Sequence, residues 1–436
     1  MSVCGAGWRV TLSGLFLSLL NRRKCIIDSH ATQRRVIVER SMFSDDRFRY
    51  LLEIKVSNRE NKNMQFGKKS LLSAVATAAL TVFGASAAIA DVKPMTIRIA
   101  ADLTGPPHPA GIAMTYFKEK LEAQVPGSEV RLYFAGALYR IPEAVEAMTE
   151  GNLEMTWGQF GKTAAVDPYM NLVVGPQLLT TAGAINSLET TSTYKFLVDR
   201  FDKVHDVEVF AAGHLSMYMG AGSGSRLMKP EDFQGKKIRS MGPAENALLA
   251  ALGSNPTTMA FGDVPPALQT GVIDGLLTSL GGFNTTKDQA PFFTIAGLNG
   301  IVGDYYWIGA SKQWLSRLDD AQRKVVRDLL VNDVMPFQKK VNFCNDRRLV
   351  EKFETKDPSK PGIYVMNAQE AAFVKTAASA TGKWIKSNTP SDADAWVDKF
   401  AMEAEALVKA NPAGSSDLEK TDCEAIKPYF SKYTKK

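Results

Sequence analysis

Residues 229–283 read KPEDFQGKKIRSMGPAENALLAALGSNPTTMAFGDVPPALQTGVIDGLLTSLGGF, a segment in which short strand-like runs alternate with short helical ones. Strands are predicted at 237–240, 257–261 and 272–278, and helices at 244–252 and 264–271. This alternation is typical of an α/β fold, in which helices cover a mainly parallel sheet.

The same alternation extends toward the N-terminal side of this segment. Further strands are predicted at 95–103, 129–135, 153–159 and 207–210, and further helices at 109–125, 142–151 and 186–204. A much longer helical pattern follows at 319–353 and would measure about 50 Å at 1.5 Å per residue. It is long enough to brace two lobes, although Pro336 should kink it. Two more amphipathic helices are predicted at 371–388 and 392–411.

Residues 64–90 have the three parts of a secretory signal peptide. Lys68 and Lys69 precede an apolar run, and an A-I-A cleavage pattern lies directly before Asp91. A membrane anchor is the alternative, but alanine, serine, threonine and glycine make this run only weakly hydrophobic. We therefore expect export to the periplasm by a cleaved signal peptide, with a mature chain that begins at Asp91.

Residues 1–63 show no clear periodicity, and a signal peptide acts at the start of a nascent chain. We therefore interpret this segment as an upstream extension wrongly assigned as coding sequence, with translation starting at Met64. A genuine extra segment of unknown use is the alternative.

The excess of basic over acidic residues in this chain comes from residues 1–90. Of the 52 lysines and arginines, 14 lie in residues 1–90, but only 6 of the 46 aspartates and glutamates do, so the net charge falls from +6 for the whole chain to −2 beyond residue 90. A strongly basic surface for nucleic acid is therefore not expected.

Cys344 and Cys423 are the two cysteines beyond residue 90, and they are too far apart in sequence for a Cys-x-x-Cys site. Without a close Cys/His cluster, neither a zinc site nor a cofactor is expected. In an oxidising compartment the pair can form a disulfide that holds the C-terminal tail, and two separate buried thiols are the alternative.

The motifs searched for catalysis do not make a convincing active site. The glycine-rich residues 220–224 are not followed by a helix that could face a phosphate, and no G-x-S-x-G motif occurs. The carboxylate pairs at 231–232 and 319–320 lie in turns or at helix starts, where capping and solvation explain them. We do not expect an enzyme; a secreted α/β enzyme such as a hydrolase is the alternative.

Arg239 and Phe261 close successive predicted strands, so they should lie at the same edge of the sheet. Ligands of open α/β sheets bind outside the carboxyl ends of the strands. Arginine carries a permanent charge and a planar fork that matches a carboxylate. A surface or interdomain salt bridge is the alternative role for an arginine at a strand end.

Three segments together resemble the solute-binding proteins of TRAP (tripartite ATP-independent periplasmic) transporters, of the DctP type. They are EDFQGKKIR, ALGSNPTTMAF and ALQTGVIDG. The likeness covers nearly all of residues 91–360, including PPHPAG at 106–111 and the long helix after Trp314. It implies a two-lobed periplasmic binding protein with a mainly parallel sheet in each lobe and a long helix bracing both. Such receptors close on an organic acid and deliver it to membrane permease subunits.

The resemblance also implies lobe boundaries. Lobe I would comprise residues 91–216 and about 304–343, and lobe II residues 217–303 and about 344–436 with the C-terminal helices. We expect a monomer. A receptor that serves a sensor instead of a permease is a further alternative.

Carried over residue by residue, Arg239 matches the family arginine that pairs with the ligand carboxylate, and Phe261 the aromatic residue that packs on the ligand. Gln159 falls where the first lobe often supplies a polar contact. His108, in the loop after the first strand, is either a further polar contact or a structural loop histidine.

The chain also departs from the family pattern. Gly220 stands where many members have a second basic residue, and Thr278 where many have an asparagine; residues 265–266 are prolines in place of an aromatic turn. These departures leave open whether the ligand carries one carboxylate or two. Four aromatic residues near the expected cleft would favour a less polar monocarboxylate, unless they pack in the core: Trp157, Tyr305, Tyr306 and Trp307.

Overall fold

The computed structural model describes residues 24–29, 34–41, 51–58 and 92–434, which belong to two compact units, Met1–Ala88 and Ile89–Lys436. In the first unit, β1 (Lys24–Ser29), β2 (Arg34–Ser41) and β3 (Leu51–Asn58) form an antiparallel sheet in sequence order. No strand was predicted in residues 1–63, where the sequence shows no clear periodicity. The predicted signal peptide and cleavage site at 64–91 lie outside the described residues.

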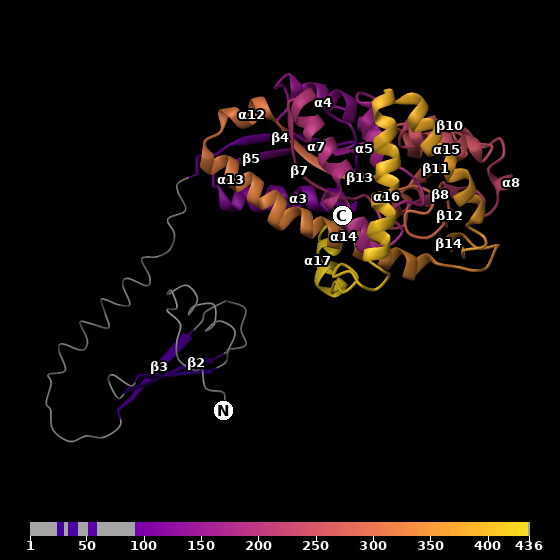
Figure 1. The fold of residues 1–436 in the computed structure, drawn as a ribbon. Coiled ribbons are helices and arrows are strands. Elements are labelled where there is room, and N and C mark those ends of the chain that lie inside the picture. The colour runs from indigo at the N-terminus through magenta and orange to yellow at the C-terminus, as the bar shows by residue number, and fades with distance from the viewer. Residues whose placement is uncertain (1–23, 30–33, 42–50, 59–91, 435–436) are drawn as a thin grey trace, which may run out of the picture. The chain divides into compact units, whose positions relative to one another are not determined.

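The second unit contains two sheets (Figure 1). The five-stranded sheet has the order β5 (Glu129–Tyr133), β4 (Thr96–Ala100), β6 (Met155–Gln159), β13 (Tyr305–Ser311), β7 (Val207–His214). The six-stranded sheet has the order β10 (Asn255–Thr258), β9 (Lys237–Ser240), β11 (Gly275–Thr278), β8 (Gly220–Ser223), β12 (Phe292–Ile295), β14 (Gly362–Val365).

Each of these sheets is parallel except for one strand. β13 runs antiparallel to both β6 and β7, and β8 runs antiparallel to both β11 and β12. The predicted α/β fold with mainly parallel sheets is thus confirmed. In the glycine-rich stretch at 220–224, where no phosphate site was expected, residues 220–223 form strand β8. Glycine is required at position 220, because a Cβ on Gly220 would lie 2.2 Å from the Thr294 carbonyl oxygen.

Helices flank both sheets. Around the five-stranded sheet they are α3 (Pro109–Gln124), α4 (Ile141–Thr149), α5 (Phe160–Thr163), α6 (Ala182–Asn186), α7 (Ser192–Val204) and α12 (Lys312–Arg317). Around the six-stranded sheet they are α8 (Pro230–Phe233), α9 (Pro243–Ala251), α10 (Val264–Gln269) and α11 (Leu280–Thr286). Short 3₁₀ turns are η1 (Pro168–Val173), η2 (Leu188–Thr190), η3 (Phe261–Asp263) and η5 (Ser391–Ala393).

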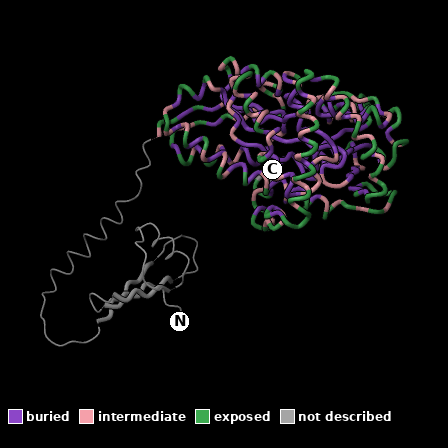
Figure 2. The backbone as a smooth tube through the Cα atoms, in the orientation of Figure 1, coloured by how far each residue is buried: buried purple, intermediate pink, exposed green. Residues whose placement is uncertain are grey.

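The two faces of the five-stranded sheet have separate cores, because successive side chains of a strand point to opposite faces. Trp157, Tyr306 and Ile308 belong to the cluster that includes α3, whereas Trp307 belongs to the cluster that includes α4 and α7. Buried residues run through the middle of the unit and exposed residues cover its outside (Figure 2). Both faces of this sheet are therefore occupied by packed helices.

The predicted long helix forms as α13 (Asp320–Leu329), a π-helical turn (Leu330–Val334) and α14 (Met335–Phe353). Its start is fixed by a capping box, in which Asp319 accepts from the Gln322 N–H at 2.9 Å. Pro336 has no N–H group and cannot donate a helical hydrogen bond. A π-helical turn lies directly before it, and the helix continues beyond it as α14. The helix contacts elements of both sheets, among them β7 and β14.

Three helices follow the six-stranded sheet in sequence: α15 (Ala372–Asn388), α16 (Asp394–Ala410) and α17 (Cys423–Thr434). α15 packs on α9, but α16 contacts α6 and α7, and α17 contacts α3 and α14. The C-terminal helices thus contact elements around both sheets, whereas the expected division placed all of them in lobe II. Cys344 and Cys423 form a disulfide between α14 and α17, which confirms the predicted link.

Two predicted elements have wrong bounds. The strand expected at 257–261 ends at Thr258, so that Phe261 lies in η3. The helix expected at 186–204 is divided into α6, η2 and α7. Among the described residues, no helix is both long and apolar enough to cross a membrane.

Candidate ligand-binding site between the two sheets

A small cavity lies where segments that follow strands of both sheets meet. From the five-stranded sheet it is lined by Leu103, His108, Gln159, Lys162 and Leu215, and from the six-stranded sheet by Arg239, Met241, Phe261, Thr278, Ser279 and Gly282. Gln159 and Thr278 are the last residues of their strands, and the other residues lie at or beyond strand ends except Arg239, which is one residue from the end of β9. This is the position at which open α/β sheets bind ligands.

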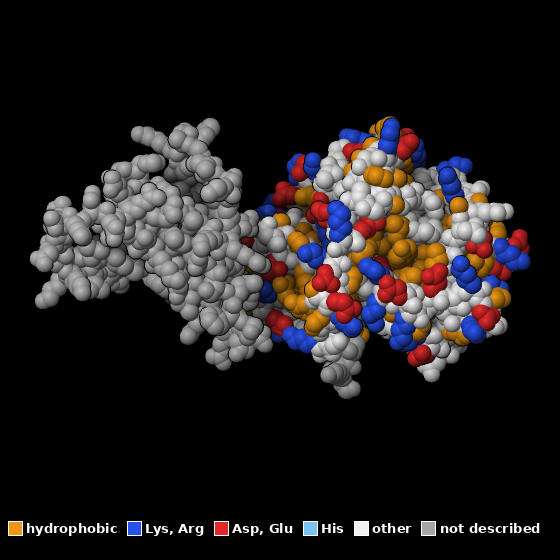
Figure 3. Space-filling view, turned by 90° about the horizontal axis from the view of Figure 1, so that it is seen from below, with side chains coloured by type: hydrophobic (Ala, Val, Ile, Leu, Met, Phe, Trp, Pro, Cys, Tyr) orange, Lys and Arg blue, Asp and Glu red, His pale blue; other side chains and the backbone are white. Residues whose placement is uncertain are grey.

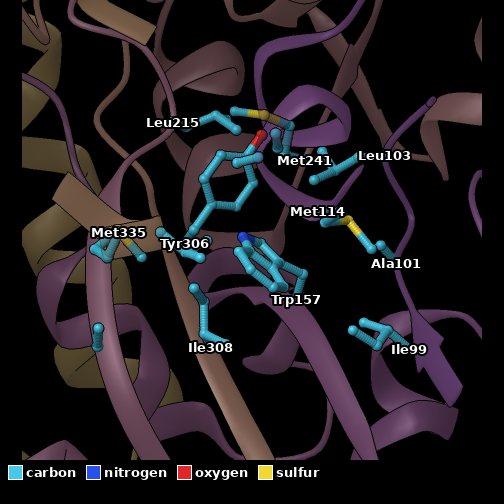
Figure 4. Packing of buried hydrophobic residues seen from close by; sticks show 14 of the residues in the cluster. Ile99, Ala101, Leu103, Met114, Trp157, Leu215, Met241, Tyr306, Ile308 and Met335 are labelled. Atoms are coloured by element: carbon cyan, nitrogen blue, oxygen red, sulfur yellow. The ribbon is translucent and has the colours of Figure 1, made fainter. Parts of the chain in front are cut away.

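Five of the six residues predicted as ligand contacts line this one cavity: Arg239, Phe261, Gln159, His108 and Thr278. Trp157 does not. Its indole is fully buried, donates from Nε1 to Oε1 of Gln338 at 2.8 Å and packs near Phe117. Figure 4 shows Trp157 beside Tyr306 within the core, with Leu103, Leu215 and Met241 of the same cluster beyond them. Core packing, the alternative weighed for Trp157, is therefore its observed role.

The other three aromatic residues are also buried in β13. Trp307 donates to Oγ1 of Thr163 at 3.0 Å, and the Tyr305 hydroxyl accepts from Asn299 at 3.1 Å. The Tyr306 hydroxyl has no hydrogen-bond partner among the described residues, and it points toward Leu215 and Met241 in Figure 4.

Arg239 is buried to 1 % exposure in β9, and its guanidinium is only partly satisfied by the protein. Nε donates to the Met259 carbonyl at 2.9 Å, and Nη1 donates to the Leu277 carbonyl at 3.0 Å. Phe261 lies against it, with its ring centroid 5.8 Å from the guanidinium carbon. No carboxylate in the described part of the chain forms an ion pair with this arginine. Burial lowers the pKa of Arg239 to about 10, so it stays charged at neutral pH.

The acids whose charges act on Arg239 are Glu245 and Asp102, and neither forms an ion pair with it. Asp102 is already paired with Lys162, at 2.8 Å. Burial, with the charge of Asp304, raises the pKa of Glu245 to about 8, so Glu245 is mostly protonated at neutral pH. A buried charge without a partner is costly, so this region of the protein favours an incoming anion.

His108 has the structural role that its sequence position allowed, and it also lines the cavity. It caps α3, because its Nδ1 accepts from the Ala110 N–H at 3.3 Å. Burial lowers the pKa of His108 to about 4, so the ring is neutral and its proton must reside on Nε2. A structural cap thus leaves a single hydrogen-bond donor, Nε2, on a residue that lines the cavity.

Sequence reasoning missed Lys162, which follows Gln159 by three residues and lies in α5, the helix directly after β6. Its ammonium forms a buried ion pair with Asp102, at 2.8 Å between Nζ and Oδ2. Burial lowers the pKa of Lys162 and the Asp102 charge opposes this effect. The signal that could have found this pair is the position of both residues just beyond strand ends in the same sheet.

The two lobes are closed around the cavity. Its volume is about 20 Å³, about the space of a single water molecule. Gly242 touches the opposite lobe so closely that a Cβ would lie 2.4 Å from the Gly161 carbonyl oxygen. At the rim, Arg140 and Asp263 form an exposed ion pair at 3.0 Å. An organic acid therefore needs the lobes to separate, or the lining side chains to move, before it can enter.

A larger surface groove of about 720 Å³ lies elsewhere, along α8 and the start of β12. It contains none of the predicted contact residues, and its charges are mixed. Within the described residues, no cluster of three His, Cys, Asp or Glu side chains could hold a metal ion.

The two-lobed α/β fold, with a buried arginine beside a cavity between its sheets, suits a solute-binding protein. The model of the DctP family, bacterial extracellular solute-binding protein, family 7, matches residues 100–387. The chain therefore belongs to this family, as the resemblance to TRAP solute-binding proteins implied.

Similar proteins of known name agree with this assignment. The ectoine-binding periplasmic protein TeaA of Halomonas elongata is 32% identical over 34% of this chain and 43% of its own length. The C4-dicarboxylate-binding periplasmic protein DctP of Rhodobacter capsulatus is 27% identical over 42% of this chain and 55% of its own. The chain thus spans about half the length of these relatives. The DctP protein of Vibrio cholerae matches at 23% identity over 76% of this chain and 91% of its own.

Solved structures share the fold. The sugar acid binding protein of Advenella mimigardefordensis in complex with galactonate has a TM-score of 0.64 at 18% identity, covering 72% of this chain and 99% of that one. A TRAP periplasmic solute-binding protein of Sulfurospirillum deleyianum with bound succinate has a TM-score of 0.63 at 20% identity, with the same coverage. The predicted two-lobed fold is confirmed.

Proposed function

We propose that this protein is a periplasmic receptor that binds a small organic acid between its lobes and delivers it to a TRAP-type transporter. The observation that carries the proposal is Arg239, a buried and charged guanidinium beside a cavity, with no carboxylate partner among the described residues. A ligand carboxylate would supply the missing charge through charge-assisted hydrogen bonds.

The remaining lining residues have complementary roles in this proposal. Phe261 packs on the ligand, and Gln159, His108 and Thr278 offer hydrogen bonds to its polar groups. The Gln159 side-chain oxygen is buried without a partner, as expected for a group that a ligand satisfies. The names of the relatives, which specify binding of ectoine and C4-dicarboxylates, support a carboxylate-bearing ligand.

Export, processing and assembly belong to the same proposal. The pattern at 64–90 supports secretion and cleavage before Asp91, and the family supports action in the periplasm without catalysis. The partners would be the membrane subunits of the transporter, with the receptor itself a monomer. The intact mass of protein isolated from the periplasm tests the processing, and a mature chain that retains residues 1–63 would contradict it.

A thermal-shift screen against organic acids tests the binding function. Ligands that bind only the native state raise the apparent melting temperature. At least one carboxylate should raise it, and the corresponding primary amide should not, because the amide lacks the charge that Arg239 requires. If no acid raises the melting temperature, or if amides act as well as acids, the proposal is wrong.

A further inference from the structure

Beside Arg239, the cavity contains a second cation whose charge is already neutralised. Lys162 lines the cavity, and the positive charge of Arg239 contributes to the lowering of its pKa, so the two cations are close neighbours. The side chains of Lys162 and Asp102 are only 7% and 4% exposed, and they meet at 2.8 Å. Lys162 is thus paired with Asp102, whereas Arg239 forms no ion pair with a carboxylate in the described part of the chain.

Lys162 also lies between the cavity and a second space. A neighbouring groove of about 220 Å³ is lined by Asp102, Arg140, Lys162, Met241 and Thr258, among others. Lys162 and Met241 line both spaces. A ligand whose first carboxylate binds Arg239, and which extends toward this groove, would bring its far end to the Lys162–Asp102 pair.

Building on the proposed function, we propose that the site accepts small acids with a single carboxylate, and that Asp102 is the residue that excludes a second one. A second carboxylate would lose its hydration and meet an ammonium already paired with a carboxylate. It would also face the like charge of Asp102, and such a juxtaposition is strongly unfavourable in a buried site. The apolar lining residues Leu103, Leu215 and Met241 suit a ligand tail that carries no charge.

Matched pairs of acids of equal chain length show how a second carboxylate changes the affinity. Calorimetry would compare butyrate with succinate, and 2-hydroxybutyrate with malate, at neutral pH on the folded protein. We expect the monocarboxylate of at least one pair to bind about tenfold or more tightly than its partner.

Three variants assign this preference to the buried pair. Asp102→Asn frees Lys162 and should reverse the preference toward succinate or malate. Lys162→Met leaves Asp102 unpaired and should weaken dicarboxylates further. The double variant Asp102→Asn/Lys162→Met keeps the net charge of the parent but lacks the Asp102 carboxylate, so the preference should become smaller without reversing, with folding checked by circular dichroism; an unchanged preference would contradict the role of Asp102.

The inference about a single carboxylate can fail while the proposed receptor function still holds. Equal or tighter binding of succinate and malate by the parent protein would overturn it, as would binding of none of the four acids. In either case the wider acid screen still tells whether the protein is a carboxylate receptor. If Asp102→Asn folds and leaves the preference unchanged, Asp102 is not the residue responsible; if it does not fold, the parent and the double variant still decide.

Discussion

At the scale of single residues, Glu245 is a buried acid that forms no ion pair with any basic residue in the described part of the chain. Its Oε2 accepts from the backbone N–H of Met241 at 2.6 Å and of Gly242 at 3.3 Å, which caps α9. Its Oε1 has no partner. The residue therefore stabilises a helix start as an acceptor, but its charge is poorly accommodated.

Glu245→Gln should make stability less dependent on pH. The pKa of Glu245 is raised from 4.5 to about 8 on folding, so its contribution is fully present below pH 4.5 and is lost as pH rises toward 8. Glutamine keeps an acceptor and removes the titration. Urea unfolding should find the variant equal to the parent near pH 5, and more stable near pH 8 by on the order of 1–3 kcal/mol.

The raised pKa of Asp304 and that of Asp346, both to about 7, should leave part of the pH dependence in this variant. If parent and variant lose the same stability between the two pH values, Glu245 is not a titrating buried acid.

Much of the site was predictable at this scale because it depends on strand ends. Arg239 was placed at the cavity because the ends of parallel strands meet at one edge, whereas Gln159 and Thr278 were carried over from the family resemblance. Trp157 was not, because alternation along a strand identifies the face of the sheet but not how far along the strand a cavity lies. The Lys162–Asp102 pair has no signal in the local pattern, because its partners are 60 residues apart; only the position of both residues beyond strand ends could have indicated it.

At the scale of elements, the contact between the N-terminus of α9 and α5 decides whether the lobes can close. Gly242 has an extended backbone conformation that alanine also adopts, with φ of −160°. Its Cβ, however, would lie 2.4 Å from a backbone oxygen of Gly161, an atom that cannot turn away. A methyl group at this position should therefore oppose closure without disturbing either sheet.

Gly242→Ala should weaken ligand binding by about tenfold or more, because closure of the lobes contributes to binding. The free energy of unfolding should change by less than about 1 kcal/mol, since nothing within one lobe is displaced. Gly224→Ala is the matched control, as a Cβ there meets nothing within 4 Å. Calorimetry and urea unfolding give the two quantities. Unchanged affinity in Gly242→Ala would mean that this contact is not part of the bound state.

The disulfide between α14 and α17 should stabilise the protein through the long loop that it closes. Cys344 and Cys423 are 79 residues apart in sequence, and a cross-link over such a loop is worth about 2–5 kcal/mol. Cys423→Ser should lower the free energy of unfolding by this order. Peptide mapping after thiol labelling of denatured, unreduced protein should find both cysteines unlabelled. Labelling of both would contradict the bond.

Elements with strong periodicity were predicted well, and those without it were not. The strand at 237–240 and the helix at 264–271 matched closely, because apolar spacing and turn residues agree there. β8 was not predicted as a strand, because a strand of glycine, alanine and serine has no β-type signal. β13 is buried on both faces, so it shows no alternation and was not recognised as a strand.

At the scale of the whole molecule, two packed sheets hold a nearly closed cavity that contains an unpaired cation. On the face of the molecule in Figure 3, basic and acidic side chains are interspersed. The net charge of −2 beyond residue 90 agrees with this mixture. The two-lobed arrangement itself was predicted only through the resemblance of residues 229–283 to a known family, because the pairing of distant segments leaves no local pattern.

The central claim is that Arg239 binds the ligand carboxylate, and calorimetry with the acid identified by screening tests it most directly. Removing one partner of a buried charge pair costs about 2–5 kcal/mol, so Arg239→Ala should lose roughly 30-fold to several thousand-fold in affinity. Arg239→Lys should recover little, because an ammonium lacks the two-pronged geometry. Arg226→Ala, which removes a guanidinium 5.4 Å from the Tyr364 ring outside the cavity, should bind as the parent does. If Arg239→Ala is folded and binds within a few-fold of the parent, the account is wrong.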